Sequence, residues 1–257
     1  MRFAKIMNGM TETDWQTTST GGLDMLRYIR TRTSARKLQL LMCAACRLAV
    51  EHLPADRAIP ILSAVEQFAE GNVPLDAFRQ AEFAAQRLER EAHGETLPGG
   101  GDSPNQSSAR WAAILALRAA VSSPLDDALH RTIDWVEAVA ARDAGEGLAR
   151  AARVKRHREL CNLFREILGN PFAPRTAVPT WMQASERAAP GWLIRVSESA
   201  RSIAEAIHRD QAYERLPILA DALEDEGCTD DELLLHFRVP AAHVRGCWAL
   251  DLILGKH

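Results

Sequence analysis

Four residues in two pairs have the types and spacing expected of metal ligands. Cys43-Ala-Ala-Cys46 places two thiols three residues apart, which is one face of a helix. His243 and Cys247 are four residues apart, so one helical turn would bring them side by side. Zinc prefers a tetrahedron of nitrogen and sulfur ligands, and the two pairs together supply one. The predicted zinc ligands are Cys43, Cys46, His243 and Cys247.

Cys228 and His236 are near the second pair in the sequence and are predicted substitutes in this ligand set. The alternative is that Cys43 and Cys46 are plain core thiols, because cysteine is among the most often buried residue types and Cys46 borders an apolar helical stripe. A redox CxxC motif lies at a helix N-terminus that follows a strand. Cys43 and Cys46 are in the middle of a predicted helix, which argues against a redox role. Five cysteines, an odd number, do not indicate a disulfide framework.

Two blocks of opposite charge are the second group of candidate functional residues. They can be solvated helix faces, surfaces that contact each other within one chain or between two, or, for the basic helix 150–158, contacts with nucleic-acid phosphates. Nucleic acid is the least favoured partner because no aromatic residues are interleaved with the basic ones. The predicted interaction residues are Arg150, Arg153, Lys155, Arg156, Arg158, Asp225, Glu226, Asp230 and Asp231.

The elements that position these residues are predicted to be helices throughout. The chain has 257 residues, 47% of them hydrophobic and 25% charged, and it is rich in Ala, Leu and Arg, which favour helices. Apolar residues recur at helical spacing, and no long stretch alternates as a strand would. We therefore expect an all-α bundle of about ten helices. Residues 94–108 are rich in Gly, Pro and Ser and are predicted to link an N-terminal lobe, 10–93, to a C-terminal lobe, 109–257.

Two of the predicted helices contain the candidate ligands. A stripe from Ser34 to Leu53 includes both residues of the CxxC motif. Pro240 is predicted to begin the last helix, which runs through Val244, Trp248 and Leu252 and so includes His243 and Cys247.

Composition and motifs exclude several classes of protein. The net charge of −3 argues against a globally basic nucleic-acid binder. No apolar run is long enough to span a bilayer, and the first residues lack the apolar core of a signal peptide, so we expect a cytoplasmic protein, with Met10 as a candidate natural start. The sequence has no phosphate-binding loop, no G-x-S-x-G elbow and no H-E-x-x-H motif.

Five segments of the sequence form a recognisable pattern. Three are C-terminal: LPILADALEDEGCTDDELLLH at 216–236, HVRGCW at 243–248 and DLILGK at 251–256. The other two, LFREILGNPF at 163–172 and RKLQLLMCAACR at 36–47, extend the pattern over most of the chain. Together they resemble a family of uncharacterised proteins that is multiplied in planctomycete-type bacterial genomes. The resemblance implies membership of this family, but no activity, cofactor or catalytic residue.

Three functions are compatible with these features. The first is a non-catalytic helical module that binds or regulates an unknown protein partner or associates with itself, which the helical pattern and the opposed charge blocks favour. The second is a zinc-stabilised helical domain, with zinc as the one cofactor considered. The third is a hydrolase or transferase, for which the available groups are His157, His208, Asp221 and Asp251. No residue is predicted to be catalytic.

Overall fold

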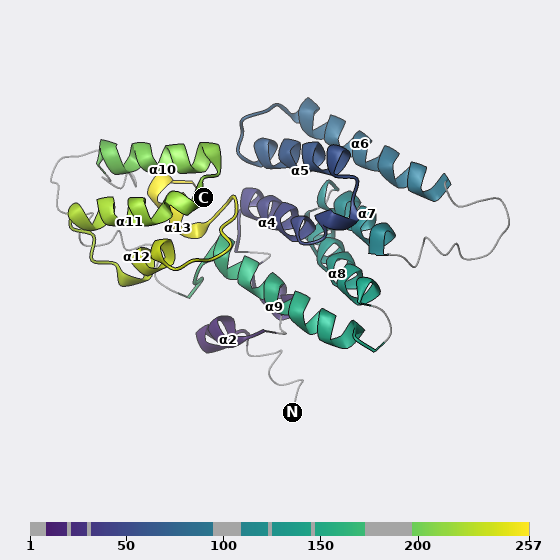
Figure 1. The fold of residues 1–257 in the computed structure, drawn as a ribbon, viewed down its shortest axis with the longest axis horizontal. Helices are drawn as coiled ribbons and strands as arrows, with labels where there is room; N and C mark the ends of the chain where they lie inside the picture. Colours follow the sequence, from purple (N-terminus) through teal and green to yellow (C-terminus); the bar gives the residue numbers. More distant parts are fainter. Residues whose placement is uncertain are drawn as a thin grey trace. The chain divides into compact units, whose positions relative to one another are not determined.

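The computed structural model describes residues 9–19, 22–29, 32–94, 109–122, 125–144, 147–172 and 197–256. These residues form twelve α-helices and two short 3₁₀-helices, and none of them is in a strand (Figure 1). The all-α prediction is therefore confirmed. Within the described ranges, no helix is both long and apolar enough to cross a membrane.

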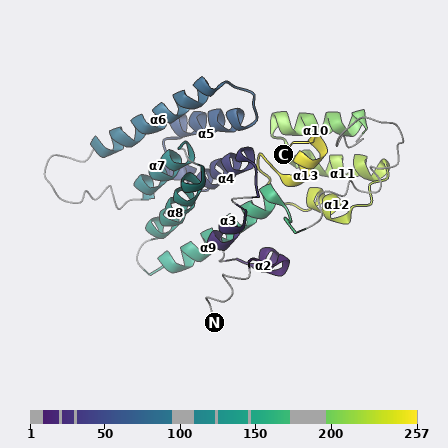
Figure 2. The ribbon, with the colours of Figure 1, turned by 180° about the vertical axis from the view of Figure 1, so that it is seen from behind.

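The chain divides into two compact units, Met1–Arg165 and Glu166–His257. The boundary falls near the end of one helix, α9, so that the last three residues of α9 belong to unit 2. Unit 1 contains α2 (Glu12–Thr17), α3 (Gly22–Ile29), α4 (Ala35–Arg47), η1 (Val50–His52), α5 (Ala55–Ala69), α6 (Leu75–Gly94), α7 (Ala109–Ala120), α8 (Leu125–Asp143) and most of α9 (Ala149–Leu168). Helix α3 is labelled in Figure 2, which shows the ribbon from behind. Unit 2 continues with α10 (Glu198–Asp210), η3 (Tyr213–Arg215), α11 (Leu216–Asp225), α12 (Asp231–Arg238) and α13 (Trp248–Leu254).

Helix α4 is the centre of unit 1. It packs against α5, α7 and α8, and every residue from Lys37 to Cys46 is buried. Two ion pairs hold it to α5: Arg36 Nη2 lies 2.7 Å from Glu70 Oε1, and Arg47 Nε lies 2.9 Å from Glu66 Oε1. Cys43 and Cys46 are among these buried residues, so the CxxC motif of α4 lies in the core of unit 1.

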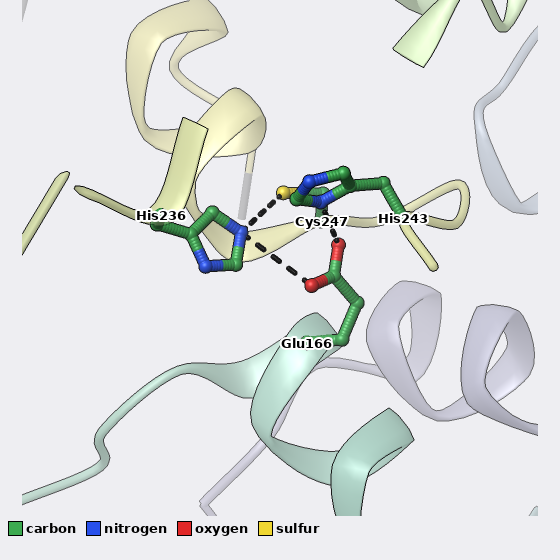
Figure 3. A group of neighbouring side chains, drawn as sticks. All are labelled: Glu166, His236, His243 and Cys247. Atoms are coloured by element: carbon green, nitrogen blue, oxygen red, sulfur yellow. Dashed lines mark hydrogen bonds and ion pairs between the residues drawn. The ribbon is translucent and has the colours of Figure 1, made fainter. Parts of the chain in front are cut away.

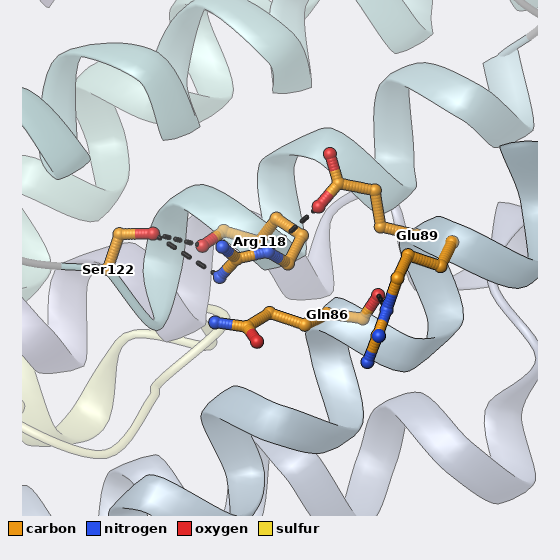
Figure 4. Close-up of polar contacts among 5 residues, drawn as sticks. Gln86, Glu89, Arg118 and Ser122 are labelled. Atoms are coloured by element: carbon orange, nitrogen blue, oxygen red, sulfur yellow. Dashed lines mark hydrogen bonds and ion pairs between the residues drawn. The ribbon is translucent and has the colours of Figure 1, made fainter.

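The helices on either side of the predicted 94–108 link pack against each other in unit 1. Arg118 of α7 pairs with Glu89 of α6 at 2.9 Å, and the Ser122 hydroxyl donates to the Arg118 carbonyl oxygen (Figure 4). The two compact units are divided at 165/166, whereas the predicted link at 94–108 lies within unit 1. The apolar face of α7 accounts for the difference, because it completes the core around α4. Residues 95–108 themselves lie outside the described residues.

Unit 2 is built on a core contributed by all four of its later helices. Leu216, Leu219 and Leu223 of α11, together with Phe237 of α12 and Ile253 of α13, are almost completely buried. Side chains cap two of these helices: Ser197 Oγ accepts from the Ala200 amide, and Asp230 Oδ1 accepts from the Leu233 amide at 3.0 Å.

The last helix differs from the prediction. Residues 239–247 form no helix, and α13 begins at Trp248 rather than at Pro240. Gly246 has a φ of 90°, a left-handed conformation that an α-helix cannot include. His243 and Cys247 are therefore not one turn apart on a helix, and any approach between them depends on the tertiary structure.

A carboxyl–imidazole pair joins α8 to α9 in unit 1. Glu137 Oε1 lies 2.8 Å from His157 Nδ1, and neither atom has a hydrogen bond to any other group among the described residues. Burial raises the pKa of Glu137 to about 7; Asp134 adds to the rise and Arg153 opposes it. Burial also lowers the pKa of His157, with a further lowering by Arg153. Both shifts favour a pair in which the groups are uncharged.

Replacing Glu137 with Gln is expected to stabilise unit 1 more at pH 8 than at pH 5. A carboxyl whose pKa is raised on folding binds more protons in the folded state, so the stability of the wild type falls as the pH rises toward about 7. Gln cannot ionise, and the variant should gain about 1–2 kcal/mol relative to the wild type across this range, after discounting for solvent screening. Urea unfolding at several pH values measures the difference in the free energy of unfolding between the variant and the wild type. A difference that stays constant or decreases as the pH rises would contradict this account.

Candidate metal centre

Four potential metal ligands lie together in unit 2 (Figure 3). Glu166 is in the last turn of α9, and His236 is in the last turn of α12. His243 lies on the irregular segment 239–247, and Cys247 is the residue that precedes α13. The donors therefore come from two helix ends and the segment between α12 and α13.

The side chains point toward one another with their donor atoms converging (Figure 3). Glu166 Oε1 lies 3.0 Å from His243 Nδ1, and Glu166 Oε2 lies 3.4 Å from His236 Nε2. His236 Nε2 is also 3.2 Å from Cys247 Sγ. One donor atom from each of the four residues lies within 4.8 Å of the other three.

Little of this cluster is open to solvent. Glu166 and His243 side chains are 8% and 5% exposed, Cys247 is buried, and His236 is 18% exposed. Aromatic rings pack around the imidazoles: the Trp248 ring lies 5.1 Å from that of His236, and the Tyr213 ring lies 6.3 Å from that of His243. The donors thus converge in largely apolar surroundings, where electrostatic interactions are stronger than in water.

Burial keeps two of the donors uncharged. It lowers the pKa of His236, against a smaller opposing effect of Glu166, with His243 adding to the lowering. Burial raises the pKa of the Cys247 thiol well above its ordinary value, and Glu166 adds to the rise. Hydrogen bonds from the backbone of Leu250 and Ala249 act in the opposite direction. Neutral imidazole is the form that binds metals.

The structure brings together part of the predicted ligand set. His243 and Cys247 belong to the cluster, and so does His236, which was predicted as a substitute. Cys43 and Cys46 are in unit 1, in the core around α4, and are not members of the cluster. Cys228, the other predicted substitute, is buried near the start of α12 in the core of unit 2 and is not a member either.

Sequence reasoning missed Glu166. The residue is 7% exposed and is surrounded in the sequence by buried apolar residues: Leu163, Phe164, Ile167 and Leu168. A single acidic residue within such a run is the signal that was available, because a buried carboxylate needs polar partners or a metal.

Several of the predicted interaction residues have structural partners in the described part of the chain. Arg156 donates to the Leu48 carbonyl oxygen at 2.6 Å, and both Lys155 and Arg156 lie near Glu159. Glu226 accepts hydrogen bonds from Ser197, and Asp230 caps α12. Seven of the nine predicted residues are exposed: Arg150, Arg153, Lys155, Arg158, Asp225, Glu226 and Asp231.

Two of the groups considered for catalysis also have partners. His157 is paired with Glu137, as described above, and Asp221 lies 2.8 Å from Arg238. His208 and Asp251 are buried in α10 and α13.

Comparison with known proteins adds nothing to this geometry. No protein-family model, curated protein or solved structure matches the chain. The function of the cluster is therefore argued from the chemistry and positions of its own residues.

We expect no cysteine of the folded, metal-free protein to react rapidly with a thiol reagent at about pH 7.5, because the thiolate is the reactive form. All five cysteines are buried and free, and burial raises the pKa of Cys46 to about 12. Titration with a chromogenic disulfide should count five thiols only after unfolding in guanidinium. One full equivalent reacting within seconds in the native protein would contradict the buried placement.

Proposed function

We propose that unit 2 is a zinc-stabilised helical domain, with Glu166, His236, His243 and Cys247 as the ligands. The observation that supports this most directly is the convergence of four potential donor atoms within 4.8 Å of one another. The cluster is formed by residues far apart in the sequence, since Glu166 precedes His236 by about seventy residues.

The separations suit a tetrahedral centre. Zinc bonds of about 2.0–2.3 Å give roughly 3.3–3.8 Å between ligands of a regular tetrahedron. The contacts of Glu166 with the two imidazoles, 3.0 and 3.4 Å, and of His236 with Cys247, 3.2 Å, are close to these values. The donor atoms lie within 4.8 Å of one another, so the widest separation exceeds that of a regular tetrahedron by at most roughly 1–1.5 Å.

The donor types favour zinc over the abundant hard cations. Calcium and magnesium take oxygen ligands, whereas three of these four donors are nitrogen or sulfur. Thiolate and carboxylate together carry two negative charges, which a divalent ion neutralises, so the loaded centre has no net charge to desolvate. A buried centre of this kind avoids the high cost of an unpaired buried charge.

Four protein ligands leave no open coordination position, which is typical of structural rather than catalytic zinc. The ion would join the last turn of α9, the last turn of α12 and the start of α13, and it would fix the irregular segment 239–247 between them. This role favours the second of the three functions considered from the sequence, with a different ligand set.

The purified chain is expected to contain about one zinc ion per molecule, and chelation is expected to lower its thermal stability. The physical reason is that zinc binds the assembled ligands of the folded state, and binding to the folded state adds directly to stability. Elemental analysis and calorimetry of the same sample measure both quantities. A folded chain that contains no metal and gains no stability from added zinc would overturn the proposal.

Matched cysteine variants identify the ligand set. Cobalt in place of zinc gives a thiolate-to-metal charge-transfer band, so Cys247→Ala should lose the band and bind metal at least about tenfold more weakly. Cys228→Ala is the control, because it removes a buried thiol of the same unit that lies outside the cluster. This control should keep the band, as should Cys43→Ala. Loss of the band in Cys43→Ala with retention in Cys247→Ala would show a different centre.

A further inference from the structure

Two exposed surfaces combine charged and apolar side chains in complementary patterns. Large apolar side chains that remain exposed in the described part of the chain include Val154 on α9, 38% exposed, and Leu235 on α12, 62% exposed. A single exposed apolar side chain is ordinary on a protein surface, so what distinguishes these two residues is the charged groups that flank each of them.

On α9 the surface is a stripe of Arg150, Val154 and Arg158. The three residues are spaced by four, so they follow one face of the helix, and all three are exposed. The two arginines have no ion pair with any other described residue. The stripe thus offers two unpaired guanidinium groups, about 12 Å apart along the axis, with an apolar side chain between them.

On unit 2 the surface is formed by α12 and the adjacent face of α11. Asp231 and Leu235 are exposed and one turn apart on α12, and Asp231 has no side-chain partner among the described residues. At the other end of α12, Arg238 is held between Asp221 and Glu224 of α11. Two carboxylates around one guanidinium leave a net negative charge there. Negative groups therefore lie on either side of Leu235, again over about two helical turns.

We propose that this chain associates with a second copy of itself, the α9 stripe of one copy docking on the α12 surface of the other. The two patterns match in sign, in spacing and in the central apolar residue. Opposite charges steer the encounter and fix the register, while Val154 and Leu235 supply the apolar contact. The surfaces differ from each other, so the contact is heterologous and forms a reciprocal dimer or a chain of copies. None of the residues that form the two surfaces is a ligand of the proposed zinc centre.

Analytical ultracentrifugation of the full chain tests the association. At roughly 50 mM salt the weight-average mass should rise above 28.4 kDa as the concentration increases from about 1 to 200 μM. At about 0.5 M salt the midpoint of association should move to at least about tenfold higher concentration, because exposed charges are then screened. A protein that remains monomeric over this whole range at low salt overturns the proposal.

Charge reversal shows which surfaces are involved. Arg150→Glu/Arg158→Glu and Asp221→Arg/Asp231→Arg should each abolish self-association, because each variant brings like charges together. An equimolar mixture of the two variants should associate again, since each reversed surface then meets a reversed partner. Arg131→Glu, an exposed reversal on α8, is the matched control and should associate like the wild type. Circular dichroism establishes that each variant is folded.

Failure of the mixture to associate, with both variants folded, would overturn the proposed pairing. Tight binding of duplex DNA or RNA to the α9 stripe at physiological salt, by a protein that remains monomeric, would also overturn the proposal. The stripe would then be a phosphate-binding surface.

Discussion

The carboxylate of Glu166 is the group around which the C-terminal part of unit 2 is arranged. A buried carboxylate is costly unless it is paired or bound to a cation. Here its two oxygens contact His243 and His236, at 3.0 and 3.4 Å. His236 in turn contacts Cys247, so one carboxylate determines where the end of α12 and the start of α13 lie. Phe237, the neighbour of His236 in the sequence, and Ala249, two residues after Cys247, lie in the apolar core.

Helical periodicity predicts most of the fold because it is a local property. The stripes in the sequence correspond to α4 through α12, with ends displaced by a few residues. The prediction is wrong at the last helix, where Pro240 and an apolar spacing suggested an early start. Gly246 has a φ of 90°, which is incompatible with a helix, and the backbone forms turns instead, with hydrogen bonds from His243 N to the Ala241 carbonyl oxygen and from Cys247 N to the Val244 carbonyl oxygen. Apolar spacing alone does not show such turns.

Local composition also does not determine how the helices divide into compact units. Residues 94–108 have a loop composition, but composition does not say whether the helices that flank a loop pack together. The apolar face of α7 requires a partner, and α4, α6 and α8 supply it within unit 1. The boundary at 165/166 falls near the end of a continuous helix, where no change of composition marks it.

The proposed zinc ligands could be predicted only in part, because spacing along the sequence does not show which residues meet in the fold. Two cysteines three apart on a helix are equally suited to chelation and to core packing, and only the surroundings of α4 decide between these. Because α4 is covered by α5, α7 and α8, its thiols lie among apolar side chains, and burial raises the pKa of both. Glu166 shows the reverse case, since its charge within an apolar run has no local explanation and requires partners from elsewhere in the fold.

Helix α12 contributes residues both to the proposed zinc centre and to the proposed self-association surface. Its eight residues have three faces: Leu233, Leu234 and Phe237 enter the core, His236 reaches the cluster, and Asp231 and Leu235 are exposed. Loss of the ion would loosen the end of α12, and the association surface includes that end, so metal removal should also weaken self-association. Because such coupling is reciprocal, self-association should strengthen metal binding by the same factor, even though Asp231 and Leu235 contribute no ligand. The buried centre and the exposed surface are therefore linked through the stability of the end of α12.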